Sequence, residues 1–372
     1  MGFRSIFLLP IAVFCAGCAT QNAELMPNNE FGDLSRSIDQ ELRRLETDGG
    51  FAGALIVEAG GKPILERGYG LADRENGTPF TVDTVAQIGS ITKQFTAIAA
   101  LTLADDGLLH LYRPIRTYLP EAPEPGASLT INQLMTHTSG LAEYCGEDDF
   151  EPLSRDRLIV ECLSKPLAFE PGTRSEYSNV GFSIVAAIIE RVTGDSLEKV
   201  LDERIFKPNR LNRTGYHFDL NDGGSYAYGY DKDVRQENIS NRIDDLGEDW
   251  WVLKGNGGIQ ASARDMQRWA HVLRGEGSLR RQTIRAFTTP RNNSDPRSQE
   301  AYGWFVFFDN DGEVLQVSHS GSDGVFFSYF WQDPRDDFFF YLVGNNGEEI
   351  SKEAVRAVRK MLFDAGDGPP GE

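Results

Sequence analysis

Ser90 and Lys93 are three residues apart and could carry out chemistry together. If Ser90 opens a helix, both side chains lie on one face and the lysine amine can reach the serine hydroxyl. An unprotonated lysine in a water-poor pocket accepts the hydroxyl proton, so that the serine oxygen can attack an acyl carbonyl. Backbone N–H groups at the helix start favour the negative charge that develops. The pair therefore predicts acyl transfer at Ser90.

The Ser-x-x-Lys pattern alone is weak evidence, because it should arise by chance about once in a chain of this length. A second copy, Ser196 with Lys199, follows a Gly-Asp pair and is typical of an ordinary helix start with a capping serine and a solvated lysine. Lys93 differs because it heads an otherwise apolar helix expected over residues 90–104, where a charge has to be paired or functional. The alternative interpretation is that Lys93 only bridges to a carboxylate.

Tyr177 and Asn179 form a second set, on a loop that follows the Pro171-Gly172 turn and precedes an apolar helix expected over residues 181–193. We expect a phenol beside a cationic lysine to be pushed toward phenolate, so that it acts as a base. The amide of Asn179 can bind both the lysine and a substrate carbonyl. In isolation, a structural tyrosine with a capping asparagine explains the same residues.

A third set, His319-Ser320-Gly321-Ser322, is expected just after a strand over residues 314–318. A glycine at a strand edge lets a substrate backbone come close. The backbone N–H groups of Ser322 and Ser90 could together form an oxyanion hole. The alternative is a simple turn with an exposed histidine.

These residues need a frame, and the chain predicts strands at both ends with helices between them. Two strands around a Gly-Gly turn form a hairpin, and the C-terminal third holds aromatic and β-branched runs separated by Asp, Asn and Gly. The fold class is therefore α+β, an antiparallel sheet formed from both termini and flanked by helices, with an inserted, mainly helical subdomain at roughly 105–250. The expected strands are 52–59, 63–70, 302–308, 314–318, 325–331 and 338–343, and the expected helices are 33–46, 90–104, 131–135, 154–164, 181–193, 196–205 and 353–363.

The three sets, in this order and on this layout, resemble the serine β-lactamase-related hydrolases, which include class C β-lactamases, D-alanyl-D-alanine carboxypeptidases, D-aminopeptidases and esterases. The resemblance covers roughly residues 36–363 and includes the segments 134–141, 169–172 and 257–265. It implies a β-lactamase/transpeptidase-like fold and a hydrolase that works through an acyl-enzyme on Ser90.

The resemblance also implies residue roles. Lys93 becomes the adjacent base and Tyr177 a second proton carrier, whereas His137 is expected to be structural. Substrate and oxyanion contacts are carried by Asn179, His319, Gly321 and Ser322. His319-Ser320-Gly321 stands where true class C β-lactamases have Lys-Thr-Gly, and a histidine near neutral pH often lacks the charge of that lysine. Ester or peptide-like amide substrates, with D-amino acid or cell-wall-derived compounds among them, are therefore favoured over β-lactams.

Composition narrows the remaining classes. The formal net charge of −19 repels phosphate backbones, so nucleic acid is not an expected partner. Zinc-protease, dinucleotide and Walker patterns are absent from the sequence, so no metal and no cofactor is expected. The Gly-x-Ser-x-Gly elbow of α/β-hydrolases is absent too. We expect a monomer whose partner is a small ester, amide or peptide substrate.

The N-terminus predicts export. Arg4 precedes an apolar run over residues 6–15, which fits a signal peptide of residues 1–17. Cys18 then resembles a lipidated cysteine, residues 18–32 a tether, and residues 33–372 the catalytic domain. The protein is thus expected at the periplasmic face of a bacterial membrane, held by a lipid anchor, with plain secretion as the alternative. In that compartment Cys145 and Cys162 could form a disulfide or remain two buried thiols.

Two questions stay open at this level. A penicillin-binding or cell-wall-sensing lipoprotein with little turnover would carry the same motifs as an enzyme. Two acidic stretches, residues 147–149 and 244–249, are either solvated loops or a rim that favours substrates carrying an amine.

Overall fold

The computed structural model describes residues 31–146, 151–221, 223–291, 297–333 and 338–365. The predicted signal peptide and most of the tether, Cys18 included, lie outside the described residues, as does the acidic stretch 147–149. Within the part that is described, no helix is both long and apolar enough to cross a membrane.

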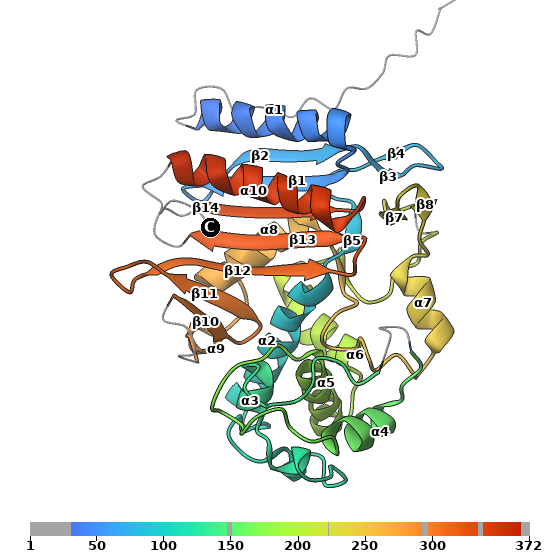
Figure 1. The fold of residues 1–372 in the computed structure, drawn as a ribbon, viewed down its shortest axis with the longest axis vertical. Helices are drawn as coiled ribbons and strands as arrows, with labels where there is room; N and C mark the ends of the chain where they lie inside the picture. The colour runs from blue at the N-terminus through green and yellow to red at the C-terminus, as the bar shows by residue number, and fades with distance from the viewer. Residues whose placement is uncertain (1–30, 147–150, 222, 292–296, 334–337, 366–372) are drawn as a thin grey trace, which may run out of the picture.

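The main sheet has seven antiparallel strands, and strands from the two ends of the chain meet in its middle (Figure 1). The C-terminal β14 pairs with the N-terminal β1, with Gly53 opposite Gly344. The sheet thus confirms the prediction of a fold built from both termini. In sheet order the strands are β10 (Ser298–Ala301), β11 (Trp304–Phe308), β12 (Val314–Ser322), β13 (Phe327–Asp333), β14 (Phe338–Gly344), β1 (Gly53–Ala59) and β2 (Lys62–Tyr69).

Both faces of this sheet are covered, which explains why its central strands are apolar throughout rather than alternating. In β14, Phe340 and Leu342 pack in the cluster under α1 (Gly32–Gly49) and α10 (Glu348–Ala365), while Phe339 and Tyr341 pack in the larger cluster on the other face. The helices α1 and α10 lie together on the outer face (Figure 1).

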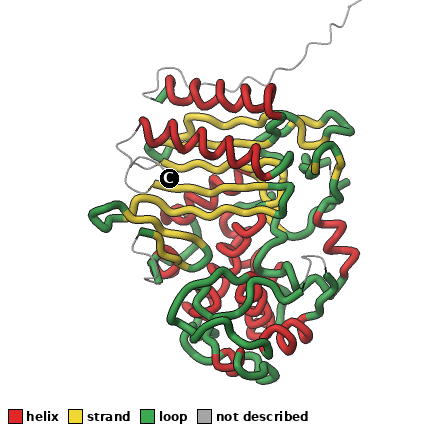
Figure 2. The backbone as a smooth tube through the Cα atoms, in the orientation of Figure 1, coloured by secondary structure: helices red, strands yellow, loops and turns green. Residues whose placement is uncertain are grey.

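The stretch between the two groups of strands is mainly helices and loops (Figure 2). Its central helix is α2 (Thr92–Asp105), of which eleven residues are buried, so it is surrounded by protein on nearly all sides. The other helices are α3 (Ile131–Met135), α4 (Arg155–Arg157), α5 (Asn179–Thr193), α6 (Leu197–Leu201), α7 (Ile239–Leu246), α8 (Ala263–His271) and α9 (Arg281–Thr288). Short strands complete the fold: β3 (Leu71–Asp73), β4 (Thr78–Pro79), β5 (Val85–Gln87), β6 (Thr214–Gly215), β7 (Tyr230–Asp231), β8 (Val234–Arg235) and β9 (Gln260–Ser262).

Two predicted boundaries are wrong in ways that matter for function. The helix expected from Ser90 begins at Thr92, because Ser90 lies in a preceding 3₁₀ helix, Gly89–Ile91. The strand expected to end at Ser318 continues to Ser322, so the third set of residues lies within β12 rather than after it.

Candidate active site

Lys93 is fully buried and its amine makes three hydrogen bonds to neutral oxygens. Nζ lies 3.0 Å from Oγ of Ser90, 2.7 Å from Oδ1 of Asn179 and 2.8 Å from the backbone oxygen of Asn256. Ser90 is half-buried, whereas Lys93, three residues further along the chain, is buried. These contacts join the first two sets of residues predicted from the sequence. Because none of these three acceptors is a carboxylate, they do not supply the ion pair of the alternative interpretation.

The start of α5 places Asn179. Ser178 caps this helix, since its Oγ accepts the N–H of Gly181 at 3.2 Å. The N–H of Asn179 donates to the backbone oxygen of Glu143 at 3.0 Å. The loop that carries Glu143 is in turn tied down by a disulfide between Cys145 and Cys162.

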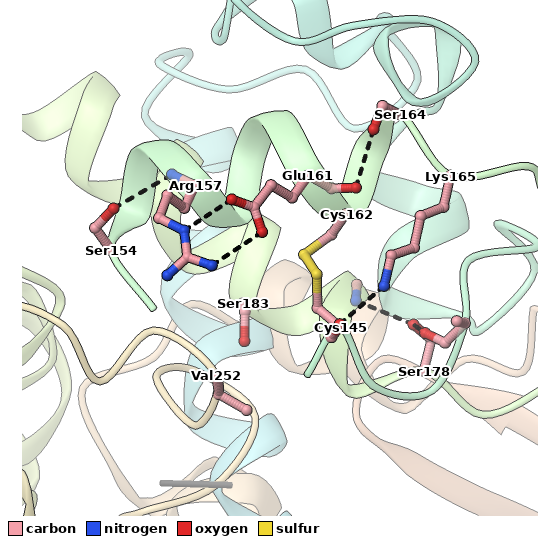
Figure 3. The surroundings of a disulfide bond; sticks show 12 residues. Cys145, Ser154, Arg157, Glu161, Cys162, Ser164, Lys165, Ser178, Ser183 and Val252 are labelled. Carbon is pink, nitrogen blue, oxygen red and sulfur yellow. Dashed lines mark hydrogen bonds and ion pairs between the residues drawn. A yellow bond between two sulfur atoms is a disulfide. The ribbon is translucent and has the colours of Figure 1, made fainter. Parts of the chain in front are cut away.

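This disulfide settles the alternative that the sequence left open between a bridge and two thiols (Figure 3). The two Cα atoms are 5.5 Å apart, and Lys165 donates to the backbone oxygen of Cys145 at 2.8 Å. Cys162 ends a π-helical turn, Leu158–Cys162, that follows α4. The bridge therefore fastens the Glu143 loop beside the start of α5 to a helical segment.

Tyr177 lies next to the amine, with Nζ of Lys93 4.8 Å from its ring centroid and a hydrogen bond to the Ser90 side chain. Burial raises the pKa of the Tyr177 phenol well above its ordinary value, against the smaller lowering effect of that hydrogen bond. The expectation of a phenol pushed toward phenolate is therefore wrong. Loss of hydration, and after it the negative charges of Glu143 and Glu300, keep the proton on the phenol, so Tyr177 enters the site as a protonated phenol.

His137 supports Tyr177 from behind. The two rings stack at 4.4 Å with an angle of 25° between their planes, and Nδ1 of His137 accepts the backbone N–H of Ser178 at 3.0 Å. Burial first, and the charge of Lys93 second, hold the pKa of His137 well below its ordinary value, so the ring is neutral and can accept. Its backbone lies in the left-handed region, with φ of 56°. These contacts support the structural role expected for His137.

The third set lies on β12 where that strand runs past its neighbour β11. The β11 register covers residues Val314 to Ser318, whereas β13 pairs with β12 as far as Ser322. β12 is thus the third strand of the sheet and not an edge strand, but its last four residues do not pair with β11. The Ser90 turn occupies the space beside them, since a Cβ on Gly89 would meet the Ser322 nitrogen at 2.6 Å. One on Gly321 would meet the Ile88 oxygen at 1.9 Å.

Only glycine permits this contact, and Gly89 also has φ of 51°. The close approach brings the backbone of Ser322 next to that of Ser90, as the oxyanion-hole hypothesis requires. Over the last four residues of β12 the burial alternates: His319 and Gly321 are buried, and Ser320 and Ser322 are exposed. Ser322 Oγ donates to Glu348 at 2.7 Å, which ties the strand end to α10.

His319 is buried rather than exposed on a turn. Burial first, and then the charge of Lys93, lower the pKa of His319 to about 3. Its Nδ1 is bonded to the backbone oxygen of Ser320, and because a carbonyl can only accept, Nδ1 carries the proton and Nε2 keeps its lone pair. The side chain is thus uncharged at neutral pH, between the rings of Tyr177 at 6.4 Å and Phe305 at 5.5 Å.

The second Ser-x-x-Lys has the ordinary role predicted for it. The Oγ of Ser196 accepts the backbone N–H of Lys199 at 3.3 Å as the cap of α6. The Lys199 side chain is half exposed and its amine pairs with Asp195 at 2.6 Å. The acidic stretch 244–249 also lies elsewhere. Asp244 and Glu248 line a cavity of about 900 Å³, and Ser90, Lys93 and Tyr177 are not among its lining residues.

Sequence reasoning missed Asn256, whose backbone oxygen binds Lys93. The cluster of glycines at 255, 257 and 258 was the available signal, since it marks a loop that can approach another chain segment closely. Among the residues that the structure describes, no group of three or more His, Cys, Asp or Glu side chains could hold a metal ion. The site that the described residues form is made of a hydroxyl, an amine, a phenol and an amide.

Known proteins share this chain's sequence and fold. Penicillin-binding protein 4* of Bacillus subtilis (strain 168) is 29% identical over 331 residues, which are 84% of this chain and 72% of that protein. Esterase EstB of Burkholderia gladioli is 32% identical over 202 residues, about half of each chain (49% and 50%). The crystal structure of a β-lactamase/D-alanine carboxypeptidase from Pseudomonas syringae superposes with a TM-score of 0.75 at 19% identity, over 90% of this chain and 99% of that one, and shows the shared fold. The Beta-lactamase family matches residues 38–364, and this protein therefore belongs to that family.

Proposed function

We propose that this protein is a serine hydrolase that cleaves ester or peptide-like amide substrates through an acyl-enzyme on Ser90. The observation that carries the proposal is the buried amine of Lys93, 3.0 Å from the Ser90 oxygen and otherwise bonded to neutral acceptors. An unprotonated amine in this place can take the hydroxyl proton directly.

In the proposed reaction, the Ser90 oxygen attacks the substrate carbonyl while its proton passes to Nζ of Lys93. The backbone N–H groups of Ser90 and Ser322 stabilise the negative oxygen of the tetrahedral intermediate. As the bond to the leaving group breaks, the phenol of Tyr177 gives that group a proton and recovers one from Lys93. Water then attacks the Ser90 ester by the reverse path and releases the acid. A Tyr177 that is protonated in the free protein suits this donor role.

The neutral His319 favours substrates without a carboxylate next to the scissile bond, because a cation that would bind such a group is missing from the third motif. Simple esters, and amides that resemble D-amino acid or cell-wall peptides, fit this site better than β-lactams. The likeness to Esterase EstB supports the ester reading.

The second candidate is a penicillin-binding or cell-wall-sensing protein that is acylated and turns over little. The likeness to Penicillin-binding protein 4* favours it. It differs from the first candidate in the fate of the acyl-enzyme, and a single experiment separates the two.

The test combines p-nitrophenyl esters, D-amino acid amides, a chromogenic cephalosporin and a fluorophosphonate probe, each with the wild-type protein and Ser90→Ala. The hydrolase predicts multiple turnovers on an ester or amide and a fluorophosphonate adduct on Ser90, both lost in Ser90→Ala. A stable cephalosporin adduct on Ser90 without ester turnover would support the sensor. Full turnover in Ser90→Ala would refute both.

We also propose that the protein is exported and anchored through lipid on Cys18 at the periplasmic face of a bacterial membrane, where it acts as a monomer. The disulfide between Cys145 and Cys162 supports an oxidising compartment. Expression in a bacterium with labelled palmitate tests the anchor. The Cys18→Ser variant should take up no label and should no longer sediment with the membranes. A wild-type protein that stays unlabelled and soluble would contradict the lipid anchor.

A further inference from the structure

The loop over residues 250–258 is held more firmly than a connecting loop requires. Thr96, on α2 one turn beyond Lys93, donates to the backbone oxygen of Gly255 at 2.7 Å. The amide of Asn256 donates to Ser183 at 2.8 Å and to the backbone oxygen of Val252 at 2.7 Å. Figure 3 shows Ser183 and Val252 near the disulfide. These bonds hold the loop around the backbone oxygen of Asn256, which the Lys93 amine contacts at 2.8 Å.

Lys254 adds a buried ion pair to this loop, two residues before Asn256. Its amine lies 2.7 Å from Glu190 and 3.0 Å from Glu198, and its side chain is only 8% exposed. The amine also sits 5.0 Å and 4.8 Å from the ring centroids of Trp250 and Trp251. The ammonium group is thus fixed on several sides.

A buried ion pair contributes little net free energy to the stability of a loop. Desolvation of the Lys254 ammonium and the Glu190 carboxylate offsets much of their attraction, and apolar side chains of similar volume often hold a fold as well. An ion pair can instead restrict where the neighbouring backbone lies. Here the neighbouring backbone includes the Asn256 oxygen that binds Lys93.

Helix α5 carries residues that contact both Lys93 and the loop over residues 250–258. Asn179 is its first residue and binds Lys93 directly. Ser183 and Glu190 are on the same helix and hold Asn256 and Lys254. The helix rises about 1.5 Å per residue, so these anchors extend over roughly 16 Å of one rigid element. The Asn179 amide oxygen and the Asn256 backbone oxygen, which accept from the Lys93 amine, are therefore both tied to α5.

We propose that Lys254 is a positioning residue. Its ion pair with Glu190 and Glu198 holds the Asn256 carbonyl against Lys93 and thereby keeps the Lys93 amine directed at Ser90. This inference rests on the proposed function, since it assigns Lys254 to the same acylation of Ser90.

The test is Lys254→Met, which keeps the length of the side chain and removes its charge. Displacing the carbonyl misplaces the Lys93 amine, so kcat on a p-nitrophenyl ester should fall about 10-fold to 10²-fold. KM should stay near its wild-type value, because Lys254 acts on the base and not on the substrate. Lys254→Arg keeps a cation between the two carboxylates and should recover most of the lost kcat.

Two control variants separate positioning from loss of charge or stability. Lys199→Met removes a lysine from the neighbouring α6, where the ion pair with Asp195 is solvent-exposed, and should leave kcat unchanged. Arg274→Met breaks the pair with the fully buried Glu58, 3.0 Å away under the sheet. It should lower Tm without changing kcat at a temperature well below the transition.

A kcat for Lys254→Met equal to that of the two controls would overturn the proposal. If Lys254→Met does not fold, Glu190→Gln tests the same link by removing the charge of the carboxylate that lies 2.7 Å from the Lys254 amine, and an unchanged kcat in that variant overturns the proposal equally. Ser90→Ala separates this inference from the proposed function. Turnover that survives Ser90→Ala refutes the function, whereas turnover lost there but kept in Lys254→Met refutes only the positioning role.

Discussion

The chain contains the same four-residue pattern twice, and the structure gives it two different roles. At Ser90 and Lys93 the amine is buried and bonded to the serine hydroxyl at 3.0 Å. At Ser196 and Lys199 the hydroxyl caps a helix, and the amine points to solvent and to Asp195. Identical spacing on a helix start therefore does not decide whether a serine is bonded to its lysine.

Burial of the helix makes the difference. α2 is covered on nearly all sides, so Lys93 is shielded from water and its amine is bonded to protein oxygens instead. α6 buries only three of its five residues and leaves Lys199 half exposed. In water the ammonium stays protonated and hydrated, and it cannot serve as a base for the adjacent hydroxyl at neutral pH.

The largest expected effect comes from removing each lysine in turn. Lys93→Ala should lower kcat on a p-nitrophenyl ester by about 10³-fold to 10⁴-fold, because the proposed base is lost. Lys199→Ala should leave kcat unchanged. Steady-state kinetics on both variants, with circular dichroism to verify folding, make the comparison. Equal rates in the two variants would show that burial of Lys93 has no catalytic meaning.

The next effect concerns the phenol, which has no counterpart beside Ser196 among the contacts described. Tyr177→Phe keeps the ring that stacks on His137 and removes only the hydroxyl. Because the leaving group then lacks its proton donor, kcat should fall about 10²-fold. The loss should be smaller for p-nitrophenyl esters, whose leaving group needs little protonation, than for alkyl esters. A loss of the same size for both leaving groups would contradict the donor role.

Much of this comparison could be predicted from residue types alone. The run of apolar residues after Ser90 predicted a buried helix, and the Gly-Asp pair before Ser196 predicted a surface cap. The sheet from both termini was equally readable, since aromatic and β-branched runs favour strands.

Other features depend on tertiary packing and could not be predicted. A backbone carbonyl such as that of Asn256 requires no particular residue type, so its contact with Lys93 leaves no trace in a pattern. The continuation of β12 to Ser322 depends on its pairing with β13, and the residue types in 319–322 do not reveal that pairing. The pKa of Tyr177 was predicted in the wrong direction, because desolvation is a property of the folded site.

Burial around the first pair should also appear in the pH dependence of stability. The pKa of His319 is about 3 in the folded protein, against an ordinary value of 6.5, so between these values the unfolded chain binds a proton that the folded protein does not. The contribution of His319 to the free energy of unfolding is therefore fully present above pH 6.5 and is lost as the pH falls toward 3. By pH 5 the loss from His319 is about 2 kcal/mol.

Urea unfolding of the wild type and of His319→Asn at pH 7 and pH 5 measures this loss. The wild type should lose about 2 kcal/mol more than the variant on acidification, since asparagine does not titrate. The same loss in both proteins would show that His319 is protonated in the folded state at pH 5.

The smallest effect belongs to the second pair and completes the comparison. Ser196→Ala removes a helix cap, which costs about 1 kcal/mol of unfolding free energy, and this cost should be the same at pH 7 and pH 5 because no ionisable group is lost. Ester hydrolysis and fluorophosphonate labelling should stay at wild-type levels. Urea unfolding at both pH values and a kinetic assay on the same preparation check the prediction. Lower activity in Ser196→Ala, at full folding, would mean that the second serine contributes to chemistry and that burial alone does not separate the two patterns.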